Sequence, residues 1–453
     1  ARSAAVAQML LACRPVIGAQ ILRACRPLAG AAAPQLPTRS GAVVDQPEAS
    51  RSRLDAIFRR GDLRCAAISS LTSFSLLAAL SAALSHTSHL ANMPTRWGVL
   101  STGGIANDFS LALSKTDGAV LHACASRSQS SADAFAATHG FSKAYASYEA
   151  LAADAEVDVV YVATPHAFHC ENILMLLEAG KHVLCEKPMV VTAAQAERCI
   201  AKAREKRRFL MEGMWTRFFP TTRAVRKLVA DGAIGKVVSM TASLGFKSEP
   251  SFNPRLFRPE LAGGALFDVG IYPSLWISMI LGVPREVSAH ATMTADGVDS
   301  FTCATFVAAD GTLAQMQCGF TGCLSNEVVI VGETGLIRVT RPVQAPDTYT
   351  LVTRQGDAPD PLLQRGVSTT VVTPLDPPNI GNAPGYNFVG SQGFVHEAAA
   401  VQEAIGKGLL EHPEMPLDET LAMARIFEKI RAQIGLTYPW DEEGEGAAKK
   451  ARR

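Results

Sequence analysis

The strongest constraint on the fold is the alternation of apolar β-type runs with helical stretches in the first half of the chain. The runs cover residues 96–100, 119–126, 157–163, 181–185 and 209–212. Strands that alternate with helices pair in parallel, because each helix returns the chain to the same edge of the sheet. The sequence therefore predicts an α/β domain over residues 93–216, built on a doubly wound parallel sheet.

A turn of small residues follows the first run. Ser101, Gly103 and Ala106 fit the spacing G-x-G-x-x-G/A, with the first glycine replaced. The central glycine of this pattern lets the backbone approach a pyrophosphate, and the last small residue lets the helix pack close to the strand. On its own, such a turn is also compatible with an ordinary strand-to-helix connection. The residues expected to contact a dinucleotide here are Ser101, Gly103, Gly104, Ile105 and Ala106.

The residue after the second run favours one dinucleotide over another. Arg127 stands where an NAD enzyme of this type usually carries Asp or Glu for the ribose hydroxyls. A guanidinium flanked by Ser126 and Ser128 suits a 2′-phosphate. The sequence therefore predicts NADP, with NAD less favoured. A solvated loop arginine is the alternative interpretation of Arg127.

The run at 181–185 leads into Glu186, Lys187 and Pro188. Pro188 cannot donate a ladder hydrogen bond, so the strand must stop there. Ligands of parallel α/β sheets bind outside the carboxyl ends of the strands, which places Lys187 for chemistry and Glu186 beside the cofactor. The alternative is a surface Glu-Lys pair on an ordinary turn.

Two further strand ends carry candidate cofactor contacts. After the run at 157–163 come two histidines, and the only nearby carboxylate is Glu171, so we expect cofactor contacts or helix capping here and no metal. Aromatic residues follow the run at 209–212, where they can wall a pocket or simply pack between two domains. The residues assigned to the cofactor at these ends are Thr164, Pro165, His166, His169, Trp215 and Arg217.

Residues 217–440 form a second domain with a different pattern. Segments of period two lie at 287–294, 300–308, 312–320, 326–331 and 335–340 and are separated by turn signals, which predicts an open, largely antiparallel sheet in an α+β domain. Residues 341–385 are expected to be mostly loop, and helices are expected near 394–405 and 417–434. One face of such a sheet needs a cover, which predicts a homodimer through this sheet.

Asp268 and Tyr272 are four residues apart in an expected helix, after Gly263 and Gly264. This spacing places an acid and a phenol on one helical face, near two glycines that permit close approach. The pair is therefore a candidate catalytic surface. A structural Asp cap and a buried Tyr are the alternative.

Three motifs together resemble the glucose-fructose oxidoreductase/inositol dehydrogenase (Gfo/Idh/MocA) family: 185–188, 212–220 and 263–272. The likeness covers residues 96–440, and it is greatest to the dihydrodiol dehydrogenase subgroup, which also oxidises D-xylose with NADP. Ser101 and Tyr272, in place of a glycine and of a common histidine, are features of that subgroup. The resemblance implies a Rossmann domain with Lys187 and Tyr272 as catalytic pair and Asp268 supporting them. It also implies Arg127 on the 2′-phosphate and a substrate site at Trp215, Phe246, Asp268 and Tyr272.

The expected reaction moves a hydride between a secondary alcohol of a cyclic diol or sugar and the nicotinamide. Oxidation needs a base for the hydroxyl proton. A phenol titrates at about 10, and an adjacent ammonium lowers that value. Tyr272 is therefore expected as acid/base, tuned by Lys187, with the reverse assignment left open. A non-catalytic NADP-binding sensor and an NAD-dependent glycoside-cleaving enzyme of the same fold are the alternative functions.

Charge and the chain ends set the remaining expectations. A net charge of +1 argues against nucleic-acid binding, and ten scattered cysteines indicate reduced thiols. Residues 1–92 read either as an Arg-, Ala- and Ser-rich transit segment for a mitochondrion or plastid, or as an upstream extension of a cytoplasmic protein that begins near Met93. The apolar run at 71–84 is short for a membrane span, so no membrane partner is expected. Residues 441–453 read as a charged, solvated tail.

Overall fold

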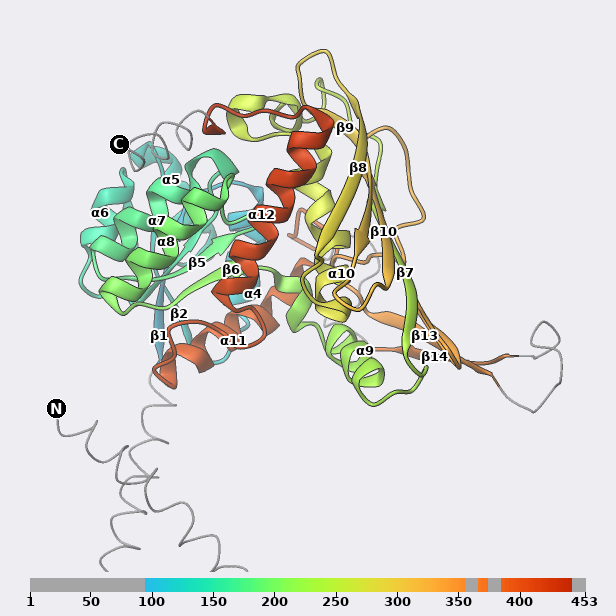
Figure 1. The fold of residues 1–453 in the computed structure, drawn as a ribbon. Helices are drawn as coiled ribbons and strands as arrows, with labels where there is room; N and C mark the ends of the chain where they lie inside the picture. The colour runs from blue at the N-terminus through green and yellow to red at the C-terminus, as the bar shows by residue number, and fades with distance from the viewer. Residues whose placement is uncertain (1–93, 355–365, 374–383, 442–453) are drawn as a thin grey trace, which may run out of the picture. The chain divides into compact units, whose positions relative to one another are not determined.

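A computed structural model of the chain describes residues 94–354, 366–373 and 384–441 (Figure 1). The expected leader at 1–92, and all but the first residue of the expected charged tail, lie outside the described residues. The described residues contain two β-sheets with helices packed on them.

The first sheet is entirely parallel, and its six strands have the order β3-β2-β1-β4-β5-β6. This order confirms the doubly wound sheet expected from the sequence. The short strand β3 was not expected, because three residues without an apolar run leave no pattern to detect. The strands are β1 (Thr95–Leu100), β2 (Ala119–Ala125), β3 (Lys143–Tyr145), β4 (Val159–Val162), β5 (His182–Glu186) and β6 (Leu210–Gly213).

Helices cover both faces of this sheet (Figure 1). Side chains cap several of them: Ser128, Ser147 and Thr192 each accept a hydrogen bond from the backbone N–H three residues later. Because both faces are covered, every residue of β4 is buried, which explains its continuous apolar sequence. The helices are α4 (Gly104–Leu113), α5 (Gln129–His139), α6 (Tyr148–Ala153), α7 (His169–Glu178) and α8 (Ala193–Lys206).

The second sheet has eight strands in the order β14-β13-β12-β11-β7-β10-β9-β8. All neighbours are antiparallel except β7 and β10, which confirms the largely antiparallel sheet. The strands are β7 (Val237–Gly245), β8 (Glu286–Met293), β9 (Asp299–Val307), β10 (Leu313–Gly319), β11 (Val328–Gly332), β12 (Gly335–Val339), β13 (Thr348–Arg354) and β14 (Gly366–Val372).

The expectation that residues 341–385 are mostly loop was wrong for β13 and β14. Nearly all of β14 is exposed, so its sequence shows no alternation between a buried and a solvated face. Strand β13 pairs with β14 through all seven of its residues, and this pairing rather than an apolar pattern defines the hairpin.

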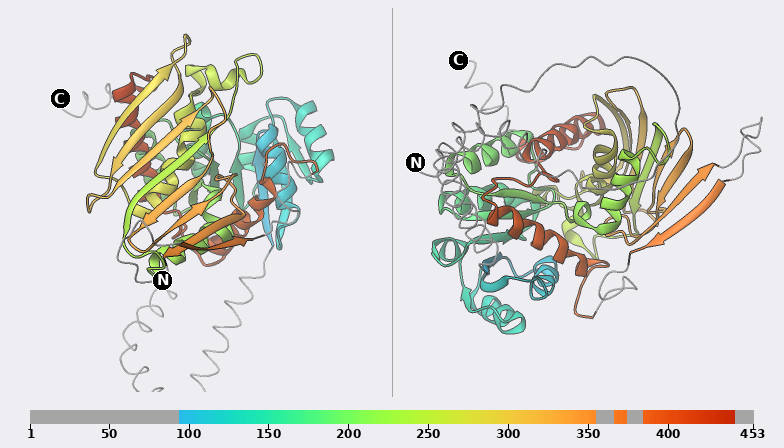
Figure 2. Two further views of the ribbon diagram at one scale, coloured as in Figure 1. Left: turned by 90° about the vertical axis from the view of Figure 1, so that its right-hand side faces the viewer. Right: turned by 90° about the horizontal axis from the view of Figure 1, so that it is seen from below.

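Helices cover one face of the second sheet. Helix α10 (Ile271–Leu281) packs on β7 and β10, and α12 (Leu417–Ile434) lies between the two sheets, against β8 on one side and α8 on the other. The left view of Figure 2 looks onto the opposite face, where no helix of the described residues covers the strands. Exposed side chains there include Thr241, Gln315 and Gln317. The remaining long helices are α9 (Pro220–Ala230) and α11 (Phe394–Gly406).

One segment of the described residues, Pro259–Leu281, is long and apolar enough to cross a membrane. However, 78% of its apolar window is buried inside the protein. It therefore packs as a core segment, and its apolar character follows from its place between the second sheet and the rest of the domain.

Candidate active site

The turn between β1 and α4 is open at the carboxyl edge of the first sheet. Gly103 and Gly104 are exposed, and no side chain caps the N-terminus of α4. Uncapped amides at a helix start attract anions such as a pyrophosphate. Ser101, which replaces the usual first glycine, has a φ of 100°, a left-handed conformation that glycine adopts without strain. Ile105 is half-buried and Ala106 is fully buried against the core, as the expected packing of this helix requires.

Arg127 lies two residues after the end of β2, exposed to solvent, where its side chain can reach a ligand. The preceding residue is tied to the turn, because the hydroxyl of Thr102 donates to that of Ser126 over 3.4 Å. Among the described residues, no ion pair involves Arg127, although its charge acts on the nearby Tyr148 phenol. Its placement is compatible with the expected contact to a 2′-phosphate.

Lys187 connects the two domains. It follows the last residue of β5, its bond to Pro188 is cis, and its ammonium donates to the backbone carbonyl of Asp268 over 2.8 Å. The same ammonium lies 4.8 Å from the ring centroid of Tyr272, within range of a cation–π contact. The structure therefore brings together the three side chains expected to be catalytic, from β5 and from the start of α10.

Tyr272 is held by an indole. The Trp215 Nε1–H donates to the Tyr272 hydroxyl over 3.1 Å, and both side chains are buried. Burial and the nearby carboxyl of Glu186 raise the pKa of Tyr272 well above its usual value. This contradicts the expectation that Lys187 makes the phenol easy to ionise. The physical reason is that burial disfavours the phenolate and that the nearby charges of Glu186 and Asp268 oppose its formation.

Burial has the opposite effect on Lys187. It disfavours the ammonium and lowers the pKa of Lys187, although the charges of Asp268 and Glu186 partly offset this. Of the two candidate bases, Lys187 is therefore the one whose proton is easier to remove.

Asp268 is an ionised acid beside two cations. Burial alone would raise its pKa, but Arg255, which donates to its carboxylate over 2.6 Å, and Lys187 lower the pKa to about 2. It belongs to a π-helical turn, Leu266–Gly270, that precedes α10. Arg255 was not expected from the sequence, because the irregular segment around it carried no motif.

The residues after β4 have mixed placements. His166 is buried, with Nδ1 3.3 Å from the carbonyl of Ala262, and burial and the Arg255 charge lower its pKa. Both ring nitrogens of His169 already face backbone carbonyls, those of Thr164 at 2.7 Å and Pro188 at 2.9 Å. His169 therefore ties the loop after β4 to the loop after β5.

The remaining contacts in this region complete the placement of the expected residues. The Thr164 hydroxyl accepts a hydrogen bond from Asn172 over 3.0 Å, and Pro165 is half-buried. Burial lowers the pKa of His169 to about 4, and a neutral ring has a single N–H that can donate to only one of the Thr164 and Pro188 carbonyls. The expected cofactor contacts of Thr164 and His169 therefore compete with bonds within the protein.

Arg217, assigned to the cofactor, and Phe246, assigned to the substrate, differ in whether their side chains are available to a ligand. The Arg217 guanidinium is buried, paired with the carboxylate of Glu419 and donating to the carbonyl of Glu414, so its contacts do not support a role at the cofactor. Phe246 follows β7 with its ring 5.4 Å from that of Phe320 and is 37% exposed, so it remains available to a substrate.

Two buried glutamates stand behind Tyr272. Glu186 accepts a hydrogen bond from the hydroxyl of Tyr161 and another from the backbone N–H of Lys187. Glu397, on α11, is fully buried, and neither of its carboxyl oxygens has a hydrogen-bond partner among the described residues. No motif in the sequence points to Glu397, because a single acid in an amphipathic helix is ordinary.

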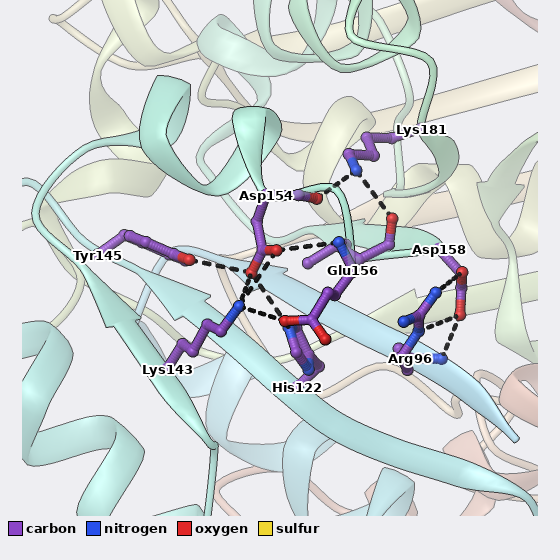
Figure 3. A network of polar contacts seen from close by, with 9 residues as sticks. Arg96, His122, Lys143, Tyr145, Asp154, Glu156, Asp158 and Lys181 are labelled. Carbon is purple, nitrogen blue, oxygen red and sulfur yellow. Dashed lines mark hydrogen bonds and ion pairs between the residues drawn. The ribbon is translucent and has the colours of Figure 1, made fainter.

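A polar network lies elsewhere, at the amino ends of the parallel strands (Figure 3). His122, Asp154 and Glu156 place ligand atoms within 4.8 Å of one another, which resembles a metal site. However, the Lys143 ammonium pairs with both carboxylates, and Tyr145 donates to Asp154 over 2.9 Å. The Lys143 ammonium therefore offsets one of the two carboxylate charges, and the contacts are those of a structural ion-pair cluster.

Comparisons with known proteins agree with this geometry. Residues 95–214 match the model of an oxidoreductase family with an NAD-binding Rossmann fold, and residues 222–338 match the GFO/IDH/MocA C-terminal domain. The trans-1,2-dihydrobenzene-1,2-diol dehydrogenase of Mus musculus is 36% identical over 354 residues, which are 77% of this chain and 100% of that protein. The Homo sapiens enzyme of the same name is 34% identical over 355 residues, with the same coverage.

Solved structures add two neighbours. KijD10, a 3-ketoreductase from Actinomadura kijaniata solved with NADP and TDP-benzene, is 28% identical with a TM-score of 0.64, and the match covers 75% of this chain and 98% of that one. A levoglucosan dehydrogenase solved with NADH and L-sorbose, at 20% identity and a TM-score of 0.67 over 76% and 97% of the chains, shares the fold. From its two domains, its site and its relatives, this chain belongs to the GFO/IDH/MocA family of oxidoreductases and is a dehydrogenase acting on CH–OH groups.

Proposed function

We propose that this protein is an NADP-dependent dehydrogenase that oxidises a secondary alcohol of a cyclic diol or sugar. The observation that carries the proposal is the meeting of Lys187, Asp268 and Tyr272 at the carboxyl edge of the first sheet, next to Trp215. The exposed Arg127 after β2 supports NADP over NAD. The dihydrodiol dehydrogenase relatives support a trans-dihydrodiol or a pyranose such as D-xylose, because both present adjacent secondary hydroxyls.

The residues at this edge fit a dinucleotide. The uncapped start of α4 would hold the pyrophosphate, and Arg127 would hold the 2′-phosphate. When bound, the nicotinamide supplies the hydride acceptor. All other steps below are assigned to side chains of this chain.

Lys187 is proposed as the base that accepts the hydroxyl proton, because burial lowers its pKa whereas it raises that of Tyr272. This reverses the assignment favoured from the sequence. The Tyr272 hydroxyl, still protonated, donates a hydrogen bond to the substrate oxygen and orients it. Asp268 holds the Lys187 ammonium through its backbone carbonyl, so that the amine is positioned before the alcohol binds.

Absorbance of NADPH tests the proposal. The full chain and a second chain that begins at Met93 are mixed with NADP and with D-xylose, D-glucose or a trans-dihydrodiol, with NAD in parallel. NADP-dependent absorbance with any of these supports the dehydrogenase and identifies its substrate class. If none of these compounds produces NADPH absorbance, although the protein binds NADP, the result would favour a sensor. Release of sugar without net reduction of the cofactor would favour a glycoside-cleaving enzyme.

The full chain and the chain that begins at Met93 also test the role of residues 1–92. If residues 1–92 are an extension of a cytoplasmic protein, the chain from Met93 keeps full activity and fluorescently tagged full chain stays in the cytoplasm. Import into a mitochondrion or plastid would instead support a transit segment.

The uncovered face of the second sheet is proposed as the dimer contact. Figure 2 shows no described helix on this face, and its exposed side chains include Thr241, Gln315 and Gln317, so a second copy could pack against it. Sedimentation velocity tests this: the wild type is expected to sediment as a dimer, and Gln315→Arg, which places a charge in the middle of the face, as a monomer.

A further inference from the structure

The first observation is the placement of Glu397 behind the catalytic tyrosine. Phe394, at the start of α11, stacks on Trp215 with ring centroids 4.4 Å apart, and Trp215 donates to the Tyr272 hydroxyl. Glu397 is three residues after Phe394, so it lies on the same face of the helix, one turn further on. It therefore points into the cluster that supports Tyr272.

A second chain of contacts leads to the same place. Phe394 also meets Phe109 edge-on at 5.6 Å, and Phe109 stacks on Tyr161 at 3.7 Å. Tyr161 donates to the carboxyl of Glu186, whose neighbour in sequence is Lys187. Both chains of contacts therefore start at Phe394, one helical turn before Glu397. One leads through Trp215 to Tyr272, and the other leads to Glu186 at the end of β5.

The second observation is the burial of the Glu397 carboxyl. It is 0% exposed, and both of its oxygens lack a hydrogen bond among the described residues. Burial and the nearby Glu186 raise the pKa of Glu397 well above its usual value, which favours the neutral acid. A buried acid without a partner is costly, which suggests that it is kept for a charge that arrives later.

The other charged groups around α11 are already engaged or lie on another face. Asp108 of α4 accepts hydrogen bonds from the backbone of residues 387 and 388, and Arg217 is paired with Glu419. On α11 itself the His396 ring packs on Phe219, and Glu403 pairs with Lys407 at the exposed end. The titratable groups of the site that interact electrostatically with Glu397 are Tyr161, Glu186 and Tyr272.

The positive charge that would enter this region is that of the oxidised nicotinamide ring. Hydride transfer requires its reacting carbon within about 3.5 Å of the alcohol carbon, whose oxygen is held by Lys187 and Tyr272. A bound ring would therefore lie next to Lys187 and Tyr272. It carries a positive charge when oxidised and none when reduced, so a carboxylate nearby favours the oxidised form.

We infer that Glu397 is a positioning residue that compensates the charge of the oxidised nicotinamide: it releases its proton to solvent when oxidised NADP binds and takes a proton up again when NADPH is formed. This inference rests on the proposed function and deepens it. The balance is simple, because one carboxyl proton leaves to solvent as one cationic ring enters, and no bond other than O–H changes. The consequence is a cofactor site whose preference for oxidised over reduced dinucleotide increases with pH.

Binding measured against pH tests this inference with the full chain. Linkage predicts that the Kd of wild type for oxidised NADP falls by up to about tenfold per pH unit over the window in which Glu397 ionises, while the Kd for NADPH changes little. Glu397→Gln removes the titrating group, keeps the shape of the neutral acid, and is expected to flatten the pH dependence for oxidised NADP. Glu403→Gln, an exposed acid on the same helix, is the matched control and is expected to behave as wild type.

Proton release provides a second measurement. With a pH indicator in weak buffer, wild type is expected to release up to one more proton than Glu397→Gln on saturation with oxidised NADP. The infrared difference spectrum of wild type alone is expected to lose a protonated-carboxyl band, which needs no folded variant. Equal proton release by wild type and variant, or no such band, would overturn the inference and assign any remaining release to Lys187 or Glu186. Protein that binds neither NADP nor NAD would overturn the proposed function itself.

Discussion

The Lys187 ammonium donates to the backbone carbonyl of Asp268 over 2.8 Å, and this bond joins the edge of the parallel sheet to the helical turn of the second domain. It also holds the ammonium 4.8 Å from the ring centroid of Tyr272. The proposed mechanism gives the two residues separate roles: the amine exchanges a proton, and the phenol orients the substrate oxygen.

Lys187→Arg tests the first role. A guanidinium cannot lose its proton in a protein, so we expect turnover to fall by about a hundred- to ten-thousandfold. Because burial lowers the Lys187 pKa, alcohol oxidation by wild type should accelerate as pH rises through that pKa, and ketone reduction should slow. The variant should lose this rise in a plot of kcat/KM against pH. A rise that persists in Lys187→Arg would assign the base to Tyr272.

Tyr272→Phe tests the second role. Removing one hydrogen-bond donor at the reacting oxygen is expected to lower kcat by about a hundred- to a thousandfold, with the affinity for NADP nearly unchanged. Stopped-flow turnover and fluorescence titration of NADPH separate the two quantities. Tyr349→Phe, a buried tyrosine of β13, is the control and should retain wild-type turnover. Normal turnover in Tyr272→Phe would remove the phenol from the mechanism.

Arg127→Ala tests the choice of cofactor. Loss of a charge-assisted contact of about 1.5–3 kcal/mol should weaken NADP binding by about ten- to a hundredfold and leave NAD binding almost unchanged. Titration of both dinucleotides measures the ratio of their Kd values. Arg285→Ala, an exposed arginine that pairs with its neighbour Glu286 outside the site, should leave the ratio as it is. An equal loss for both dinucleotides would place Arg127 away from the 2′-phosphate.

Gly264→Ala tests the backbone that leads into the catalytic helix. Gly264 has a φ of +113°, and a Cβ there would lie 2.3 Å from the Asp299 Oδ1. We expect a loss of at least about 2 kcal/mol in the free energy of unfolding, from strain and from displacement of Asp299. Urea denaturation is the measurement. Gly297→Ala, with a φ of +84° and no atom within 4 Å, isolates the strain alone and should cost about 1 kcal/mol.

The displacement of Asp299 has a further expected effect. Its carboxylate accepts hydrogen bonds from the Leu266 backbone N–H over 2.8 Å and the Thr302 hydroxyl over 2.7 Å, so it anchors the turn that carries Asp268. Gly264→Ala should therefore lower turnover as well as stability, whereas Gly297→Ala should not. Unchanged turnover in Gly264→Ala would show that Asp268 does not depend on this anchor.

The local pattern of the sequence determined the two sheets and most of the residues at the site. Strand β5 and its stop at Pro188, and the turn at Gly103, are read from neighbours in sequence, because burial on both faces and the loss of a backbone donor leave direct traces. Parallel strand order then places Lys187 and Arg127 at one edge. The exposed hairpin β13–β14 left no such trace, because its pairing depends on backbone contacts rather than on an apolar face.

Only the tertiary structure decided how the site residues act. Lys187 and Asp268 are 81 residues apart, and no spacing in sequence reveals that the ammonium meets a backbone carbonyl and the face of the Tyr272 ring. The pKa of each group depends on its burial and on charges from other elements, which is why the sequence favoured the wrong direction for Tyr272. Glu397 could not be identified from the sequence for the same reason. The free energy of ionising a buried acid depends on the groups around it in space, and the sequence shows only that the acid is present.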